Sequence, residues 1–391
     1  MSQDNFTINK PVAKTYAEYT AHADHYLTIQ GVPPSLAVRI PGFVDFGING
    51  DILVDIVRKV GPEHGPATLG WSDALIAYGH QAMKKGEQAE AQEDFNQAEQ
   101  GFLEASFWYF FARFPHILNE GGAKAYHLHT EAHLRAVKHS ESSLEIIEIN
   151  HEGKIGKAFL RIPNHTLSQF PAVMISGGID VWKSDLEIHS LSENFLKRGM
   201  ATLLIDIPGT GDAPIAGSLT AHNWYLSALD TLKNHPKINS SLVGVYGLSF
   251  GGYWATKLAF LAPWLKGIVS TGGPIHHTFQ AEWLSQLPVG LKATLARMLN
   301  IDPLKDHHFM IQQLSQFSLY TQGLLSAKHY APILSINGEE DEMVPIQEIS
   351  FLKENGIKQD SLIFAYDRHV ASRNWRLHEN FAAEWLAKKL A

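Results

Sequence analysis

Hydrophobic and polar positions follow different patterns in the first third of the chain and in the remainder. Up to about residue 140 the apolar residues recur with a helical period, most clearly over residues 52–60, 71–85 and 84–114 and with mixed spacing over residues 16–29. Alternating β patterns are almost absent there. We therefore predict a helical N-terminal cap domain over residues 1–140 and a second domain over residues 141–391.

Short apolar runs of strand length alternate with helical patterns in the second domain. The first two, residues 143–150 and 157–162, flank the turn Asn150-His151-Glu152-Gly153 and predict a β-hairpin. Six further runs are spaced for parallel βαβ crossovers. They lie at residues 172–176, 202–206, 242–246, 267–271, 333–337 and 362–366. The pattern predicts an α/β fold with an eight-stranded, mostly parallel sheet flanked by helices.

The connection between the sixth and the seventh predicted strand is too long for a single crossover. We interpret residues 275–328 as a helical insertion after the sixth strand, over the carboxyl edge of the sheet. Loops at that edge build the active sites of open α/β sheets. The second domain is therefore the expected location of any catalytic residues.

Composition and charge exclude several classes of protein. The chain of 391 residues is 45% hydrophobic and 18% charged, which is ordinary for a folded globular protein. A net charge of −8 argues against nucleic-acid and anionic-membrane partners. Without cysteine there are no disulfides, thiolate metal sites or cysteine nucleophiles. With no signal-like N-terminus and no apolar run of membrane length, we expect a cytoplasmic protein.

The most informative motif follows the predicted strand at residues 242–246. This run leads into Gly247-Leu248-Ser249-Phe250-Gly251, and a helical pattern begins at once. Strand, Gly-x-Ser-x-Gly and helix in this order are typical of a nucleophile elbow, where glycines remove Cβ atoms from a crowded turn. We predict that Ser249 is a catalytic nucleophile. The alternative is a glycine-rich strand-to-helix turn with a capping serine.

A serine nucleophile needs a base and a group that orients the base. In α/β-hydrolases these follow the serine in the order acid, then histidine. Four acids, Glu339-Glu340-Asp341-Glu342, follow a predicted strand, and we choose Asp341 because it lies in the middle of the turn; the alternative is a solvated acidic loop. His369, after the last predicted strand, is the expected general base. Its rival His378 lies within the final helical pattern.

The oxyanion of a tetrahedral intermediate requires two N–H donors. The residue after the nucleophile, Phe250, is expected to provide one. The second is expected from Gly178 or Ile179, in the glycine-containing loop Ser176-Gly177-Gly178-Ile179-Asp180 after a predicted strand. A plain glycine turn is the alternative for this loop. The chemistry needs no cofactor, and we expect none.

Aromatic residues and histidines supply weaker signals. The run of residues 107–114 is rich in aromatic side chains and is interpreted mainly as core, with some members as walls of an aromatic substrate pocket. Histidines at 127, 129, 133 and 139 lack the His-Glu-x-x-His pattern, so we expect no metal site. The candidate pocket residues are Trp71, Tyr78, Trp108, Arg113, Trp283 and Tyr320.

Taken together, these motifs resemble the FrsA-like branch of the α/β-hydrolases. The matching segments are residues 176–180, the Asp-Ile-Pro-Gly-Thr-Gly loop at 206–211, the elbow around Ser249, and Gly-Gly-Pro-Ile-His at 272–276. The resemblance covers about residues 140–391 and implies an α/β-hydrolase fold with an N-terminal helical cap. It also implies a triad of Ser249, Asp341 and His369.

Members of this branch differ in the bond that they cleave. The chain is similar to members that hydrolyse a C–C bond next to a ketone in aromatic or polyketide-derived substrates, and this retro-Claisen activity is the expected function. Other members are simple esterases, so a carboxylesterase or thioesterase with the same triad is the alternative. A non-catalytic binding protein is a further alternative. We expect a small aromatic or acyl substrate and a homodimer.

Overall fold

The computed structural model describes residues 5–8, 40–45, 47–60, 68–165, 167–302 and 307–391. These residues form two compact units. The first, called the sheet unit, contains strand β1 (Asn5–Ile8) together with Glu145–Lys183 and Leu191–Ala391. The second, called the helical unit, contains the described part of residues 40–144 together with the segment Ser184–Ser190.

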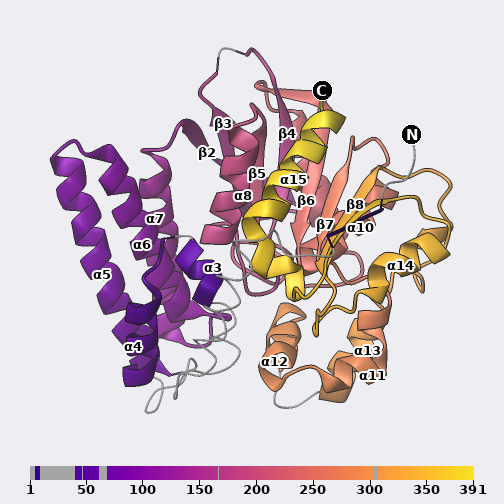
Figure 1. The fold of residues 1–391 in the computed structure, drawn as a ribbon, viewed down its shortest axis with the longest axis horizontal. Coiled ribbons are helices and arrows are strands. Elements are labelled where there is room, and N and C mark those ends of the chain that lie inside the picture. Colours follow the sequence, from indigo (N-terminus) through magenta and orange to yellow (C-terminus); the bar gives the residue numbers. More distant parts are fainter. Residues whose placement is uncertain (1–4, 9–39, 46, 61–67, 166, 303–306) are drawn as a thin grey trace. The chain divides into compact units, whose positions relative to one another are not determined.

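A single mostly parallel sheet forms the centre of the sheet unit (Figure 1). In the described residues its order is β1-β9-β8-β7-β6-β4-β5-β3-β2. Pairing is parallel from β1 through β5, β3 pairs antiparallel with β5, and a hairpin of β2 and β3 ends the sheet. The remaining strands are β2 (Ser142–His151), β3 (Lys154–Pro163), β4 (Phe170–Ser176), β5 (Ala201–Ile205), β6 (Ile238–Leu248), β7 (Ile268–Thr271), β8 (Ile333–Gly338) and β9 (Asp360–Phe364).

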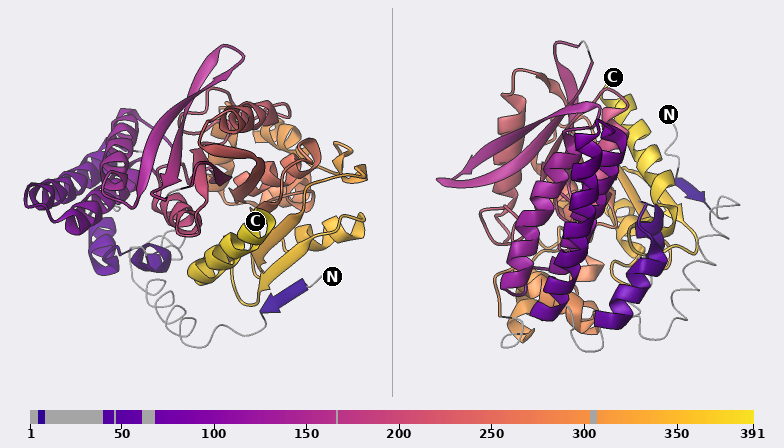
Figure 2. Two further views of the ribbon diagram at one scale, coloured as in Figure 1. Left: turned by 90° about the horizontal axis from the view of Figure 1, so that it is seen from above. Right: turned by 90° about the vertical axis from the view of Figure 1, so that its left-hand side faces the viewer.

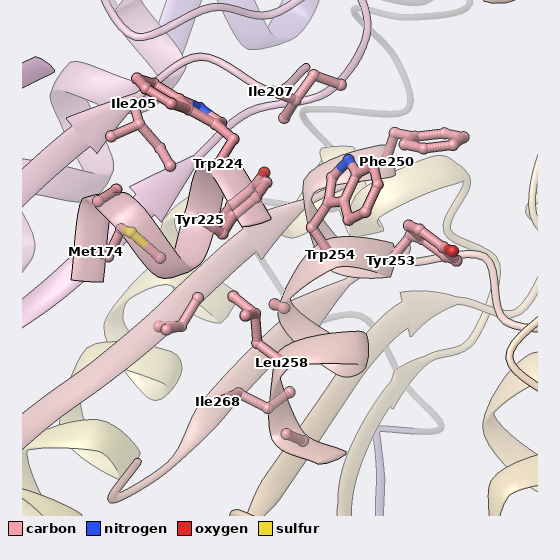
Figure 3. Close-up of a cluster of buried hydrophobic side chains, with 14 of the residues drawn as sticks. Met174, Ile205, Ile207, Trp224, Tyr225, Phe250, Tyr253, Trp254, Leu258 and Ile268 are labelled. Atoms are coloured by element: carbon pink, nitrogen blue, oxygen red, sulfur yellow. The ribbon is translucent and has the colours of Figure 1, made fainter. Parts of the chain in front are cut away.

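Helices cover both faces of this sheet. On one face the ring of Tyr246 in β6 packs against Phe195 of α8 (Leu186–Leu196), and α15 (Trp375–Lys389) is hydrogen-bonded to α8. On the other face Val245 belongs to a buried cluster with Tyr225 of α9 (His222–Lys233) and Trp254 of α10 (Phe250–Leu261), as Figure 3 shows for the two aromatic side chains. The helix α14 (Gln347–Glu354) joins β8 to β9. The sheet is therefore buried on both faces, which explains the continuous apolar strands of the sequence.

All eight predicted strands are present, and the prediction of an α/β fold with a mostly parallel sheet is confirmed. The structure adds a ninth strand, β1, in a region that the sequence pattern assigns to the helical domain. Residues Asn5–Ile8 pair in parallel with Ser361–Phe364 of β9. Four residues are too few to show a recognisable alternation, and the pairing joins segments at opposite ends of the chain. Local pattern analysis does not detect such a strand.

The segment between β7 and β8 contains short helices, as predicted, and packs over the carboxyl edge of the sheet. Its main helices are α11 (Ala281–Gln286), α12 (Val289–Met298) and α13 (His307–Ser315). The carbonyl of Met298 accepts a hydrogen bond of 2.8 Å from Gly217 N, in the long loop after β5. The indole of Trp283 donates to the carbonyl of Met343, in the loop after β8, at 3.0 Å. Both loops leave the sheet at the carboxyl ends of parallel strands.

The helical unit is built around three long helices that lie side by side (Figure 2). They are α5 (Leu69–Ala91), α6 (Phe95–Arg113) and α7 (Glu120–Val137). Two shorter helices, α3 (Ile40–Asp45) and α4 (Gly50–Val60), precede them. Within the described residues, no helix is both long enough and apolar enough to cross a membrane. The helical pattern predicted at residues 16–29 lies outside the described residues.

The boundary between α5 and α6 differs from the sequence prediction. The patterns at residues 71–85 and 84–114 suggest a break near residue 85, but α5 continues to Ala91. The break comes at Glu93, which has a left-handed φ of 58°, and at Asp94, whose carboxylate caps α6 by accepting from Gln97 N at 3.1 Å. Polar residues dominate this stretch, so no apolar period marks where one helix ends.

Candidate active site

Ser249 occupies a strained turn between β6 and α10. Its φ of 54° and ψ of −121° lie in a region that residues with a side chain rarely adopt. The turn is tight enough to exclude side chains beside it, because a Cβ atom on Gly247 would lie 2.0 Å from the carbonyl oxygen of Gly251. Such strain persists only where surrounding structure enforces it, and it clusters at functional sites. The geometry matches the elbow that the sequence pattern predicts.

His369 lies within hydrogen-bonding distance of the other two predicted triad residues. His369 Nε2 is 2.9 Å from Ser249 Oγ, and His369 Nδ1 is 2.7 Å from Asp341 Oδ2. Ser249 comes from the β6–α10 turn, Asp341 from the loop after β8, and His369 from the loop after β9. The carboxyl ends of three parallel strands thus bring together residues that are far apart in the sequence. An imidazole that is within hydrogen-bonding distance of a carboxylate therefore faces a hydroxyl, the arrangement that activates a serine nucleophile.

Asp341 is held as an ionised acceptor. Burial acts to raise its pKa, but the charge and hydrogen bond of His369, together with donors from Val344 N and Asn337, outweigh burial and leave the pKa below its ordinary value. Its Oδ1 accepts from Met343 N at 2.8 Å and Val344 N at 3.0 Å. The three neighbouring glutamates of the acidic run are exposed, whereas the Asp341 side chain is fully buried.

Asn337 is a positioning residue that sequence reasoning does not find. Its Nδ2 donates to Asp341 Oδ2 at 2.8 Å, and its Oδ1 accepts from Val370 N at 3.0 Å. One side chain at the end of β8 therefore joins the acid loop to the histidine loop. Val370 has a left-handed φ of 57°, so the loop after His369 is held in a strained conformation. A polar residue next to the last position of a mostly apolar strand is the signal of this role in the sequence.

The predicted oxyanion donors lie beside Ser249. A Cβ atom on Gly178 would lie 3.0 Å from Ser249 Cβ and 3.3 Å from Ser249 Oγ, so the loop after β4 directly adjoins the hydroxyl. Phe250 is the first residue of α10, and an N–H at that position has no acceptor within its helix. Ile179 follows Gly178 and is buried. Gly178 therefore adjoins the hydroxyl, and Ile179 and Phe250 follow Gly178 and Ser249 directly in the chain.

The rival histidine, His378, lies within α15 and away from these contacts. It is fully buried beside Trp375, at a ring-centroid distance of 4.9 Å, and beside Phe364. Among the residues that the structure describes, neither of its ring nitrogens has a hydrogen-bond partner. Burial lowers the pKa of His378 to about 3. It is a neutral core residue.

Substitution of His378 by leucine is expected to make the free energy of unfolding less dependent on pH in the acid range. Between pH 6.5 and 3 the unfolded chain binds a proton at His378 that the folded chain does not, so folding stability falls as the pH falls. Each pH unit corresponds to about 1.4 kcal/mol. The free energy of unfolding, measured by urea denaturation, is compared between His378→Leu and the parent. The difference, variant minus parent, should be about 2 kcal/mol larger at pH 5 than at pH 7. Parallel pH profiles would contradict this account.

Two candidate pocket residues, Trp283 and Tyr320, lie on the insertion between β7 and β8. Trp283 is partly buried and donates to Met343, two residues from Asp341. The Tyr320 side chain is exposed and contacts the rings of His276 and Phe351 at centroid distances of 5.3 and 5.7 Å. Contact of these two side chains with substrate stays a prediction. Of the two, Trp283 is hydrogen-bonded to the loop that carries Asp341.

The other four candidate pocket residues lie in the core of the helical unit. Trp71 and Trp108 are almost fully buried, and their indoles donate to Phe111 O and Glu104 Oε1. Tyr78 packs on Trp108 at a ring-centroid distance of 5.7 Å. Arg113 Nη2 is 2.7 Å from both carboxylate oxygens of Asp185, and both side chains are fully buried. The Arg113 guanidinium therefore forms a buried ion pair with Asp185.

The histidines of α7 also take part in local structure. His129 Nε2 is 2.9 Å from the carbonyl of Ser184 and 3.3 Å from Asp185 Oδ1. His139, just after the helix, is 2.9 Å from Glu90 Oε1 and stacks on Phe95. These contacts place both imidazoles in the packing of the helical unit.

Comparison with known proteins identifies the family. The family described as "Esterase FrsA-like" matches residues 64–391. The chain belongs to the FrsA-like family. It is an esterase-type α/β-hydrolase. The esterase FrsA of Yersinia enterocolitica serotype O:8 / biotype 1B (strain NCTC 13174 / 8081) is 30% identical over 285 residues, which cover 71% of this chain and 68% of that protein. The esterase FrsA of Yersinia pestis (strain Pestoides F) is 28% identical over 330 residues, covering 81% and 76%.

Solved structures share the fold at lower sequence identity. The 2,6-dihydroxy-pseudo-oxynicotine hydrolase aligns with a TM-score of 0.73 at 20% identity, over 94% of this chain and 95% of that chain. The protein AbyA5 aligns with a TM-score of 0.63 at 22% identity, over 79% and 92%. The FrsA-like chain therefore has an α/β-hydrolase fold, as its motifs predict.

Proposed function

We propose that this FrsA-like chain is a serine hydrolase that cleaves carboxylic esters through Ser249, His369 and Asp341. The observation that carries the proposal is the unbroken series of two hydrogen bonds, 2.9 Å from Ser249 Oγ to His369 Nε2 and 2.7 Å from His369 Nδ1 to Asp341. His369 removes the proton as Ser249 Oγ attacks the carbonyl carbon. Asp341 orients the imidazole and stabilises its cation.

The negative charge that develops on the carbonyl oxygen is stabilised by N–H groups of Phe250 and of Gly178 or Ile179. Collapse of the tetrahedral intermediate expels the alcohol, which takes the proton from His369, and leaves an acyl group on Ser249. Water, deprotonated by His369, then releases the acid and restores the hydroxyl. These steps need no metal and no cofactor.

Cleavage of a C–C bond next to a ketone is the second candidate. It is favoured by the resemblance to C–C-cleaving members of the family and by the likeness to the 2,6-dihydroxy-pseudo-oxynicotine hydrolase over 94% of the chain. Here Ser249 attacks a ketone, and the leaving group is a carbanion that His369 protonates. This step requires a stabilised carbanion such as an enolate or an aromatic ring bearing hydroxyls. The triad itself does not distinguish the two bonds.

A matched pair of substrates separates these candidates. The enzyme is incubated with an aryl ester and with the corresponding aromatic β-diketone, and products are identified by mass spectrometry beside Ser249→Ala. Esterase activity predicts acid and phenol from the ester, with the diketone intact. Acid and ketone from the diketone, absent with Ser249→Ala, would establish C–C hydrolysis. If neither substrate turns over and a fluorophosphonate adds no mass at Ser249, the protein is not a serine hydrolase.

A further inference from the structure

A fully buried lysine, Lys183, lies near the end of the loop that carries Gly178 and Ile179. Lys183 Nζ is 2.6 Å from Asp206 Oδ2 and 2.7 Å from Asp212 Oδ2. Lysine is almost never fully buried unless it is paired. All three residues belong to the sheet unit, and none of them is part of the proposed triad. The function of the triad therefore does not account for this charge cluster around a buried lysine.

Asp206 joins two loops at the carboxyl edge of the sheet. Besides the ammonium of Lys183, its carboxylate accepts from Lys183 N at 2.9 Å and from Asp212 N at 2.9 Å. Asp206 directly follows β5, whereas Lys183 lies near the end of the loop that follows β4. The indole of Trp224 donates to the carbonyl of Asp206 at 3.0 Å, which attaches this residue to the core helix α9. The end of the β4 loop is therefore held by a buried, fully bonded carboxylate.

The beginning of the same loop is held by the nucleophile elbow. A Cβ atom on Gly251 would lie 2.3 Å from the carbonyl oxygen of Gly177 and 2.6 Å from that of Ser176, so the elbow and the loop pack backbone against backbone. Tyr225 donates to Ser176 Oγ at 2.9 Å. The predicted oxyanion donors, Gly178 and Ile179, thus lie between two fixed points, Ser176 and Lys183.

We propose that Lys183 is a positioning residue for the oxyanion hole. It would hold the Gly178–Ile179 backbone in place through its ion pairs with Asp206 and Asp212. Oxyanion donors act only when they are oriented before the reaction, because reorganisation during the reaction cancels their benefit. Loss of the Lys183 ammonium removes both ion pairs and weakens the attachment of this part of the donor loop, where the backbone hydrogen bond from Lys183 N to Asp206 remains. This inference rests on the proposed serine hydrolase function.

The test compares Lys183→Met with Arg161→Met. Arg161 is the matched control, because its guanidinium is also fully buried in the sheet unit and is paired with Glu193 and Ser192, away from the β4 loop. Three quantities are measured after titration of active sites with a fluorophosphonate: kcat, KM for an aryl ester, and the inhibition constant of an arylboronic acid. The boronic acid forms a tetrahedral adduct with a serine and places an oxygen in the oxyanion hole.

For Lys183→Met we expect kcat/KM and boronic acid affinity to fall together by about 100-fold, with KM nearly unchanged. Arg161→Met should lower thermal stability. It should leave kcat/KM and boronic acid affinity within about threefold of the parent, because the partners of Arg161 lie away from the β4 loop. Equal losses in both variants, or an unchanged boronic acid affinity in Lys183→Met, would overturn the proposal.

A milder variant covers the case in which Lys183→Met does not fold. Asp212→Asn removes one charged partner of Lys183, and the Asp212 side chain is 32% exposed, so folding should survive. It is expected to show a smaller parallel loss of kcat/KM and boronic acid affinity, and no loss of affinity would count against the role of the cluster. If the parent enzyme had neither esterase nor C–C hydrolase activity, the proposed function itself would be refuted. That question is decided separately, by the comparison of the parent with Ser249→Ala.

Discussion

Replacing Ser249 with alanine is expected to lower kcat on the order of 10⁶-fold, because the members of a triad act as a unit and the nucleophile has no substitute. The measurement is the initial rate of aryl ester hydrolysis, followed at enzyme concentrations high enough to detect the residual rate. KM should change little, since the hydroxyl contributes to the transition state more than to binding. Residual activity above one hundredth of the parent would show that Ser249 is not the nucleophile.

A second variant at the same position separates loss of chemistry from loss of structure. Ser249→Gly should be as inactive as Ser249→Ala, but more stable than it by about 1 kcal/mol, because glycine adopts the φ of 54° without strain. Thermal or urea denaturation of the two inactive variants measures this difference. Equal stabilities would mean that the elbow relaxes when its hydroxyl is removed.

Arg113→Met is expected to destabilise the helical unit by about 3–5 kcal/mol, because it leaves the buried Asp185 carboxylate without its main charged partner. Arg113 is bonded to both Asp185 oxygens at 2.7 Å, and its guanidinium lies over the ring of Phe110 at 5.0 Å. Urea denaturation followed by circular dichroism near 222 nm, where the helical unit contributes strongly, is the appropriate measurement.

An exposed ion pair in the same unit serves as the control. Lys85 Nζ lies 3.4 Å from Glu104, with side chains 66% and 37% exposed, so Lys85→Met should change stability by less than about 0.5 kcal/mol. The double substitution Arg113→Met with Asp185→Leu should recover much of the loss, since an apolar pair can replace a buried ion pair. Similar effects for Arg113→Met and Lys85→Met would contradict a buried, paired role for Arg113.

The order of motifs along the chain predicts eight of the nine described strands and the three residues of the proposed triad. Buried strands of a parallel sheet are short, apolar and regularly spaced, and each of the eight predicted runs forms a strand. Ser249, Asp341 and His369 follow the ends of such strands, so the topology brings them together without further information. The elbow is recognisable because its tight turn leaves no room for a side chain two residues before and two residues after the serine, at Gly247 and Gly251.

The features that escaped prediction depend on contacts between distant segments. Asn337 and Lys183 carry no motif of their own, and their partners Val370 and Asp206 become visible only in three dimensions. Large aromatic side chains such as Trp71 and Trp108 occur both in pocket walls and in cores. The structure places these two in the core of the helical unit. Sequence periodicity reports burial, but it does not report what a buried side chain faces.

The pairing of β1 with β9 has a consequence for how the sheet is completed. During synthesis, residues 5–8 leave the ribosome hundreds of residues before Ser361–Phe364, so the edge of the sheet closes only after almost the entire chain has been made. Until then β1 has no partner strand, and without β1 the finished sheet would leave β9 without a neighbour on that side. An unpaired strand edge can bind another chain. A truncation or a bulky fusion at the start of the chain should therefore affect solubility during expression more than it affects the chemistry of the folded enzyme.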